Sequence, residues 1–302
     1  MTTRKIAAET TGPVTIDASL LRHGGAISVR TDAHCERAVL TISTTDEDGA
    51  AADAVRDATL RRSTTGLVAA VEGKGGGASG TTVITGGGRG MTVIQSSGSV
   101  HGSVVGMNFV GGNVYVNGAR ISGGATTVVT GTAPIEITAT VPPGSKVIGR
   151  TDSADIEARG SFAVVSGHTQ SGDIRVDHTE KLIASTKSGD VTVDKAADSN
   201  IKTMSGDVQL DRTDLAEVHT MSGDIGVRDF GGTARLKTMS GDIRVHATAG
   251  GDLDASSMSG DISVTATPAA LDADLQVRPH SMSGRINVPS RRVPGSGPRR
   301  RS

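Results

Sequence analysis

Residues 201–210 read IKTMSGDVQL, and most of this stretch returns three more times. The copies are VHTMSGDIGV from Val218, LKTMSGDIRV from Leu236 and ASSMSGDISV from Ala255. The serine that opens the SGD motif falls at Ser171, Ser188, Ser205, Ser222, Ser240, Ser259 and Ser283, with intervals of 17, 17, 17, 18, 19 and 24 residues. A period of this length is too short for a helical hairpin and is typical of one coil of a β-solenoid.

Apolar and polar residues alternate on both sides of each motif. After the aspartate, Val208 and Leu210 flank Gln209, and before the motif Ile201 is followed by Lys202. A period of two marks a short strand with one face turned inward. The sequence therefore predicts an all-β chain, a parallel β-helix-like solenoid of 17–19-residue coils with a strand on each side of an SGD corner.

The corner explains why the motif repeats. Glycine enters positive φ without steric cost, and serine and aspartate side chains hydrogen-bond nearby backbone. Stacked coils lie about 4.8 Å apart, so a bend that fits one coil fits its neighbours. We therefore expect each SGD to be a bend whose glycine has positive φ.

Composition and charge restrict the class of protein. The chain has 41 Gly, no Trp, one Tyr and three Phe, so a core must be narrow and built from Val, Ile, Leu and Ala. The 31 basic and 32 acidic side chains nearly cancel, which argues against a body that coats nucleic acid or anionic lipid. One cysteine excludes an internal disulfide, and without a signal peptide or spanning segment we expect a cytoplasmic protein.

The N-terminal part, residues 1–72, resembles decayed coils. GGAISVR from Gly24 aligns with SGDIRV from Ser171, which puts Ile27 and Val29 in the places of Ile174 and Val176. The segment AAADAVRDATLRR, residues 50–62, fits either a short helix or a strand.

Three further segments follow. Residues 73–131 form a glycine-rich insert in which NVYVNGARIS predicts a hairpin turning at Asn117-Gly118. Residues 132–288 form the SGD-repeat solenoid. Residues 289–302 form a basic tail that we expect to be disordered.

The TMSGDI repeats, with the strand-rich N-terminal segment, resemble the bacterial putative-adhesin family of β-strand-repeat proteins, whose domain has no established function. The resemblance is strongest from Ser153 to Val288. It implies a β-solenoid-like fold and a cell-envelope context, and it brings no agreed catalytic residues.

The motif aspartates should form a column along one edge. Stacked carboxylates repel unless each one caps backbone donors or shares a cation. Calcium takes about 6–8 oxygens and each coil supplies one carboxylate, so corner capping is favoured and a calcium ladder is the alternative. Arg285 replaces the aspartate in the last coil, and it either pairs with Asp261 and ends the column or reflects sequence drift in a terminal repeat. The candidate ladder residues are Asp173, Asp190, Asp207, Asp224, Asp242 and Asp261.

A second column precedes the motif serine. Burial within the corner is the favoured interpretation of its methionines. Earlier coils accept Gln170 and Lys187 at this place, so the alternative is an exposed apolar strip for a partner or a second copy. The interaction candidates are Met204, Met221, Met239, Met258 and Met282.

The histidines, the cysteine and the glycine-rich string lack the neighbouring residues that a metal site, an active site or a nucleotide site requires. His168, His219 and His280 share an outward column with serines and lysines, and His34-Cys35-Glu36 has no visible fourth ligand, so we interpret all of them as surface residues. GGGASG from Gly75 matches a dinucleotide fingerprint only as a string, because a strand follows it. No cofactor and no catalytic residue are predicted.

The sequence favours a non-enzymatic structural or interaction module, an adhesin-like scaffold that can self-assemble through its ends. A polysaccharide-binding or polysaccharide-cleaving solenoid and a calcium-binding repeat module remain as alternatives. The expected partner is another protein or a second copy. The tail could add weak attraction to anionic membrane or nucleic acid through Arg291, Arg292, Arg299, Arg300 and Arg301.

Overall fold

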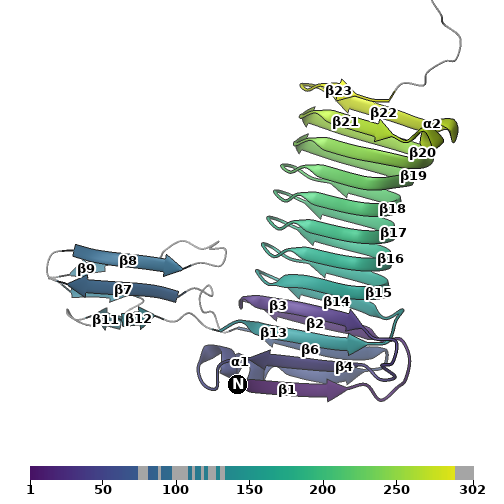
Figure 1. Cartoon of the computed structure of the whole chain (residues 1–302). Helices are drawn as coiled ribbons and strands as arrows, with labels where there is room; N and C mark the ends of the chain where they lie inside the picture. Colours follow the sequence, from purple (N-terminus) through teal and green to yellow (C-terminus); the bar gives the residue numbers. More distant parts are fainter. Residues whose placement is uncertain are drawn as a thin grey trace, which may run out of the picture.

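The computed structural model describes residues 1–73 and 133–289, and between them only the backbone of six short strands (Figure 1). Val116 lies opposite Ala119, so the predicted hairpin is present, although its turn residues lie outside the described part. The glycine string from Gly75 and the five arginines of the tail also lie outside it. The six strands are β7 (Thr81–Gly87), β8 (Gly90–Ser96), β9 (Asn108–Val110), β10 (Asn113–Val116), β11 (Ala119–Ile121) and β12 (Thr127–Val129).

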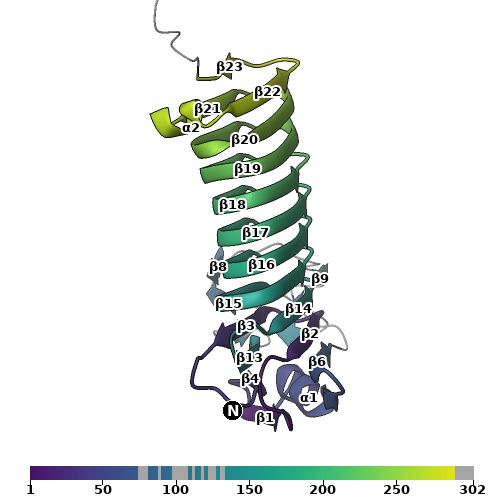
Figure 2. The same cartoon turned by 90° about the vertical axis from the view of Figure 1, so that its right-hand side faces the viewer.

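The SGD repeats form a long stack of parallel strands (Figures 1 and 2). Each repeat contributes one layer, and the register places Ile174, Val191, Val208 and Ile225 in one column. The predicted mostly β architecture with stacked parallel strands is confirmed. The strands are β15 (Asp155–His168), β16 (Ile174–Thr186), β17 (Val191–Thr203), β18 (Val208–His219), β19 (Ile225–Ser240), β20 (Ile243–Ser259), β21 (Ile262–Ala266), β22 (Leu275–Ser281) and β23 (Ile286–Asn287).

The long strands are bent (Figure 2), and in each of them apolar residues on both sides of the bend are buried. In β16, Ile174 and Val176 are buried before the bend, and Leu182 and Ala184 after it. The two runs face each other across a core of mainly Val, Ile, Leu and Ala, as the composition predicts. Between the two runs of β16, His178, Glu180 and Lys181 are exposed, whereas Thr179 is buried.

Two N-terminal strands pair with strands of the first layers of the stack. The strand β3 (Gly25–Thr31) lies between β13 (Ile135–Val141) and β15, and β2 (Thr15–Leu21) lies between β6 (Gly66–Glu72) and β14 (Lys146–Thr151), all in parallel. Ile27 lies opposite Ile156, which lies opposite Ile174. The predicted equivalence of Ile27 with Ile174 is therefore confirmed.

Beyond Val29 the predicted alignment with the repeats is wrong. The strand β4 (Val39–Thr44) runs antiparallel to β1 (Thr2–Ala7) and to β13, and β5 (Thr59–Ser63) runs antiparallel to β6. Residues 50–62, whose sequence fits either a helix or a strand, form the helix α1 (Ala50–Asp57) followed by β5. The end of a stack of parallel strands exposes strand edges, and these antiparallel elements cover them at this end.

Side chains complete the closure of the N-terminal end. The helix α1 buries Ala51, Ala52, Ala54 and Val55 in the apolar core formed with β1, β4 and β6. Arg62 Nε donates a hydrogen bond to the carbonyl oxygen of Ala7 at 2.9 Å, so a charged side chain occupies the last acceptor of β1.

The opposite end is more open. The short helix α2 (Pro268–Asp272) begins at Thr267, whose hydroxyl accepts a hydrogen bond from the N–H of Ala270 at 3.2 Å. In the last layer Ile286 and Val288 are 43% and 39% exposed. None of the helices in the described ranges is both long and apolar enough to cross a membrane.

Candidate functional site

A buried threonine holds the SGD corners of Gly172, Gly189 and Gly206, whereas among the described residues the Thr220 hydroxyl has no hydrogen-bond partner and Thr238 donates to the carbonyl oxygen of Gly223. The hydroxyl of Thr186 accepts a hydrogen bond from the N–H of Gly189 at 2.9 Å, and Thr203 accepts from Gly206 at 3.0 Å. The threonines are buried although they are polar. A side-chain oxygen that satisfies a backbone donor stabilises such a bend.

The corner glycine is required for close stacking. Among the described residues, the glycines with positive φ lie elsewhere, for example Gly160 and Gly232, so the predicted positive φ of the SGD glycine is wrong. A Cβ on Gly189 would lie 1.9 Å from the carbonyl oxygen of Gly172 in the preceding layer. A Cβ on Gly206 would meet the carbonyl oxygen of Gly189 at the same distance. Any side chain at this position would force neighbouring layers apart.

The motif aspartates form a hydrogen-bonded ladder. Oδ1 of each carboxylate accepts a hydrogen bond from the backbone N–H of the aspartate in the next layer, at 2.8–3.0 Å. This agrees with corner capping as the role of these carboxylates, because each negative charge is bound to a backbone donor. The ladder runs through Asp155, Asp173, Asp190, Asp207, Asp224, Asp242 and Asp261.

Arginines occupy the second oxygen of several ladder carboxylates. Arg244 donates to Oδ2 of both Asp224 and Asp242, at 2.8 and 2.7 Å. Partial burial works to raise the pKa of Asp224, but the N–H of Asp242 and the Arg244 guanidinium outweigh it and hold that pKa below its usual value.

Arg285 pairs with Asp261 and ends the ladder, one of the two outcomes that the sequence left open. Its backbone N–H donates to Oδ1 of Asp261 at 2.8 Å, and its guanidinium donates to Oδ2 at 2.8 and 3.1 Å. The backbone hydrogen bond from Arg285, followed by the one from its side chain, lowers the pKa of Asp261. Since Arg285 carries no carboxylate, it offers no acceptor to a further layer.

The methionine column is exposed, so the favoured interpretation of burial within the corner is wrong. The alternation that buries Thr203 turns Met204 outward on the same strand face as Lys202. Four of the five side chains are 45–48% exposed and the last is 71% exposed. We call this column the methionine edge; it consists of Met204, Met221, Met239, Met258 and Met282.

Charged residues border the methionine edge on both sides in two of its layers. Lys202 and Lys237 lie two residues before a methionine, and both are exposed. Asp207 and Asp242 lie three residues after the same methionines, where the next strand begins. We call these borders the lysine flank and the aspartate flank.

The predicted surface residues include the three histidines of the outward column. His168 and His280 are exposed, and His219 is partly buried with Nε2 3.3 Å from Glu217. Cys35 donates from Sγ to the carbonyl oxygen of Arg37 at 3.1 Å. Within the described part of the chain, no three His, Cys, Asp or Glu side chains gather where they could hold a metal ion.

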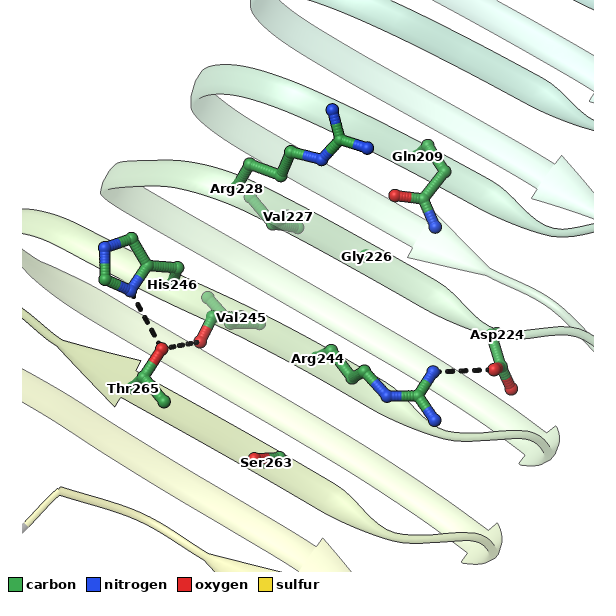
Figure 3. Close-up of a pocket in the computed structure, with 10 residues that line it drawn as sticks. All are labelled: Gln209, Asp224, Gly226, Val227, Arg228, Arg244, Val245, His246, Ser263 and Thr265. Atoms are coloured by element: carbon green, nitrogen blue, oxygen red, sulfur yellow. Dashed lines mark hydrogen bonds and ion pairs between the residues drawn. The ribbon is translucent and has the colours of Figure 1, made fainter.

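A depression of about 580 Å³ lies on the outer face of the stack (Figure 3). It is centred on Gly226, which stands in a column where Gln209 and Arg244 carry side chains. Arg228 and His246 border it from the next outward column, and His246 Nδ1 lies 2.8 Å from the hydroxyl of Thr265. Polar donors and acceptors therefore surround a gap left by one missing side chain.

Two features escaped the sequence reasoning. The depression had a visible signal, since Gly226 is the glycine in a column of mostly polar side chains. His23 had none: its ring is only 3% exposed, and both of its nitrogens lack a hydrogen-bond partner. Burial lowers the pKa of His23.

A family model described as Toastrack DUF4097 matches residues 111–296. A crystal structure of a putative adhesin from Parabacteroides merdae is 12% identical over 96% of both chains, with a TM-score of 0.43. A putative adhesin from Parabacteroides distasonis is 10% identical over 95% of this chain and 96% of that one, with a TM-score of 0.33. No curated protein matches the chain.

Proposed function

This chain belongs to the toastrack DUF4097 family, and we propose that it is a non-enzymatic, adhesin-like β-solenoid scaffold that binds a protein partner along its methionine edge. The observation that carries the proposal is the exposure of Met204, Met221, Met239 and Met258 at 45–48% each, in one line. A contiguous exposed apolar patch bordered by polar residues marks an interaction site. Methionine is suited to such a surface because its flexible thioether adapts to different partners.

The backbone beneath the methionine edge supports a rigid display. The N–H of Ser222 donates to the carbonyl oxygen of Met204 at 2.8 Å, and that of Ser240 to Met221 at 2.9 Å. Because the N–H groups of Ser222 and Ser240 are already hydrogen-bonded, a partner that covers the methionine side chains leaves neither donor unsatisfied. The ladder carboxylates are likewise engaged in structural hydrogen bonds, which supports a scaffold role over acid–base chemistry.

Self-assembly through the ends is the less supported form of this proposal. The N-terminal end is covered by α1, β1 and β5, and Arg62 occupies a carbonyl oxygen at the edge of β1. Arg285 occupies both oxygens of the last ladder carboxylate. Growth by adding one chain after another needs two open, complementary ends, so we expect association to reach a plateau.

Light scattering after size-exclusion chromatography, over a range of concentrations, tests the proposal. We expect the wild type to gain mass with concentration, and the double variant Met221→Lys/Met239→Lys to lose that gain while keeping its circular dichroism spectrum. Leu215→Lys is the matched control, because Leu215 is 47% exposed and lies far from the corners on the same strands. Association that survives the double variant would rule out the methionine edge as the contact.

A second candidate function is binding of a polar ligand such as a polysaccharide in the depression at Gly226. Arg228, Arg244, Gln209 and Thr265 supply donors and acceptors of the kind that sugar hydroxyls use. Gly226→Thr would fill the gap, and its Cβ would meet only the movable end of Gln209. A melting shift with an oligosaccharide that Gly226→Thr abolishes would support this candidate.

The basic tail, residues 289–302, adds a separate proposal of weak attraction to anionic membrane or nucleic acid. Co-sedimentation with phosphatidylserine vesicles at low and high salt tests it. We expect deletion of the tail to remove the salt-sensitive part of the binding and to leave the methionine edge unaffected.

A further inference from the structure

We infer that the methionine edge joins two copies of this chain that run parallel, related by a two-fold axis along the stack. The inference rests on the proposed function, since it names the partner of the same edge. It is carried by the order of charges across the edge, which is the same in the layers of Met204 and Met239.

The order repeats with identical spacing. Lys202, Met204 and Asp207 follow one another in one layer, and Lys237, Met239 and Asp242 do so two layers further. Lys202, Lys237 and Asp207 are exposed. In these two layers the edge presents a lysine, a methionine and an aspartate in the same order, and His219, Ser256 and His280 take the place of the lysine in the other layers.

The aspartate flank keeps a net negative charge despite the arginines. Asp224 and Asp242 share the single guanidinium of Arg244, so two carboxylates face one cation there. The arginine contacts of the ladder lie at other aspartates than Asp207, the acid that shares a layer with Lys202. The two borders thus differ in sign in the layer of Met204, where Lys202 and Asp207 lie on opposite sides.

Symmetry decides how two such edges can meet. A two-fold axis along the stack reverses the order across the edge and keeps the level, so Lys202 faces Asp207 of the second copy and Met221 faces Met221. A two-fold axis across the edge reverses the direction of the stack and brings lysine flank against lysine flank. Opposite charges favour the first arrangement and like charges oppose the second.

The repeat itself favours a second copy over an unrelated protein. The methionines are spaced by layers about 4.8 Å apart, and a partner must offer apolar groups at the same spacing along four or five layers. A parallel second copy has the same spacing, so each methionine lies opposite the same methionine of the other copy. Isologous contacts of this kind are the commonest in soluble homo-oligomers.

Disulfide cross-linking tests both the contact and its direction. The background carries Cys35→Ser, which removes the chain's one cysteine. Met204→Cys and Met258→Cys lie three layers apart, about 14 Å along the stack. A disulfide needs Cα atoms within about 7 Å, so each arrangement can link only certain pairs.

The parallel arrangement predicts that each single-cysteine variant forms a covalent dimer with itself on oxidation with oxidised glutathione. In an equal mixture, mass spectrometry should find 204–204 and 258–258 peptides and almost no 204–258 peptide. A matched control is Leu215→Cys in the same background, which should stay monomeric on a non-reducing gel. Lys202→Glu/Lys237→Glu should lower the dimer fraction at low salt.

Three results would overturn this inference. Dominant 204–258 peptides would mean antiparallel copies; the methionine edge would then still be the contact, and the proposed function would stand. A wild type that stays monomeric at every concentration and gives no cross-link would exclude the second copy but leave a different protein partner. Dimers that persist in Met221→Lys/Met239→Lys would overturn both this inference and the proposed function.

Discussion

Replacing one corner glycine tests whether close stacking, and not backbone conformation, determines the repeat. In Gly206→Ala the new Cβ would lie 1.9 Å from the carbonyl oxygen of Gly189, whereas ordinary contact begins at 3.4 Å. The two layers must therefore separate locally by about 1.5 Å, because the oxygen belongs to backbone and cannot swing away. That separation breaks the bond from the N–H of Ser205 to the carbonyl oxygen of Lys187 and the bond from the N–H of Asp207 to Oδ1 of Asp190, both of which join the two layers.

The expected cost follows from these two bonds. A neutral hydrogen bond contributes about 0.5–1.5 kcal/mol and one to a charged group about 1.5–3, so Gly206→Ala should lower the free energy of unfolding by about 2–4.5 kcal/mol. Gly226→Ala is the matched control, since its Cβ meets the movable carboxamide of Gln209, and should change stability by under about 1 kcal/mol. Urea unfolding followed by circular dichroism measures both. Equal midpoints for the two variants would refute close stacking as the reason for the glycine.

Three further predictions follow from the ladder and from the buried histidine. Arg285→Asp should lower the melting temperature at low salt more than at high salt, because a second carboxylate replaces the guanidinium that now holds Asp261; equal effects at both salt concentrations would remove the electrostatic role. Millimolar calcium should leave the melting temperature unchanged, since one oxygen of each ladder carboxylate already accepts an N–H, and calorimetric heat that Asp207→Asn reduces would instead support the calcium alternative. Burial lowers the pKa of His23 in the folded state, so stability should be complete above the unfolded value near 6.5 and fall as the pH drops toward the folded pKa; His23→Leu should lack this part of the loss, and a wild-type urea midpoint that is the same at neutral and mildly acidic pH would contradict it.

The stack could be predicted from the sequence because the period of the repeat determines which residues lie opposite one another in neighbouring layers. Once Val208 and Leu210 alternate with Gln209 at a fixed period, stacking places the same pattern in every layer. The resemblance to the putative-adhesin family agrees with the toastrack match. The N-terminal part could not be predicted in this way, because β4 reverses direction there and antiparallel pairing leaves no fixed spacing in the sequence.

The candidate site was predicted in its residues but not in its geometry. The aspartate column and the Arg285–Asp261 pair followed from counting positions, whereas the exposure of Met204 depended on where the bend begins. Alternation continues through Thr203, which is buried, so the next residue faces outward. The role of Gly206 required the position of the neighbouring layer, which no local rule for turns contains.

The ladder also determines which surfaces remain for association. In each layer Oδ1 of the aspartate can accept a backbone N–H from a following layer. A chain built only of SGD repeats would therefore end in a free acceptor and an open strand edge, to which a further layer could add. Arg285 takes the last acceptor with its own N–H and places a cation where the next carboxylate would stand. At the other end β4 runs antiparallel to both β13 and β1, so the parallel pairing of the stack ends there. With both ends unsuited to continue the repeat, the regular apolar surface that remains runs along the side, at the methionine edge.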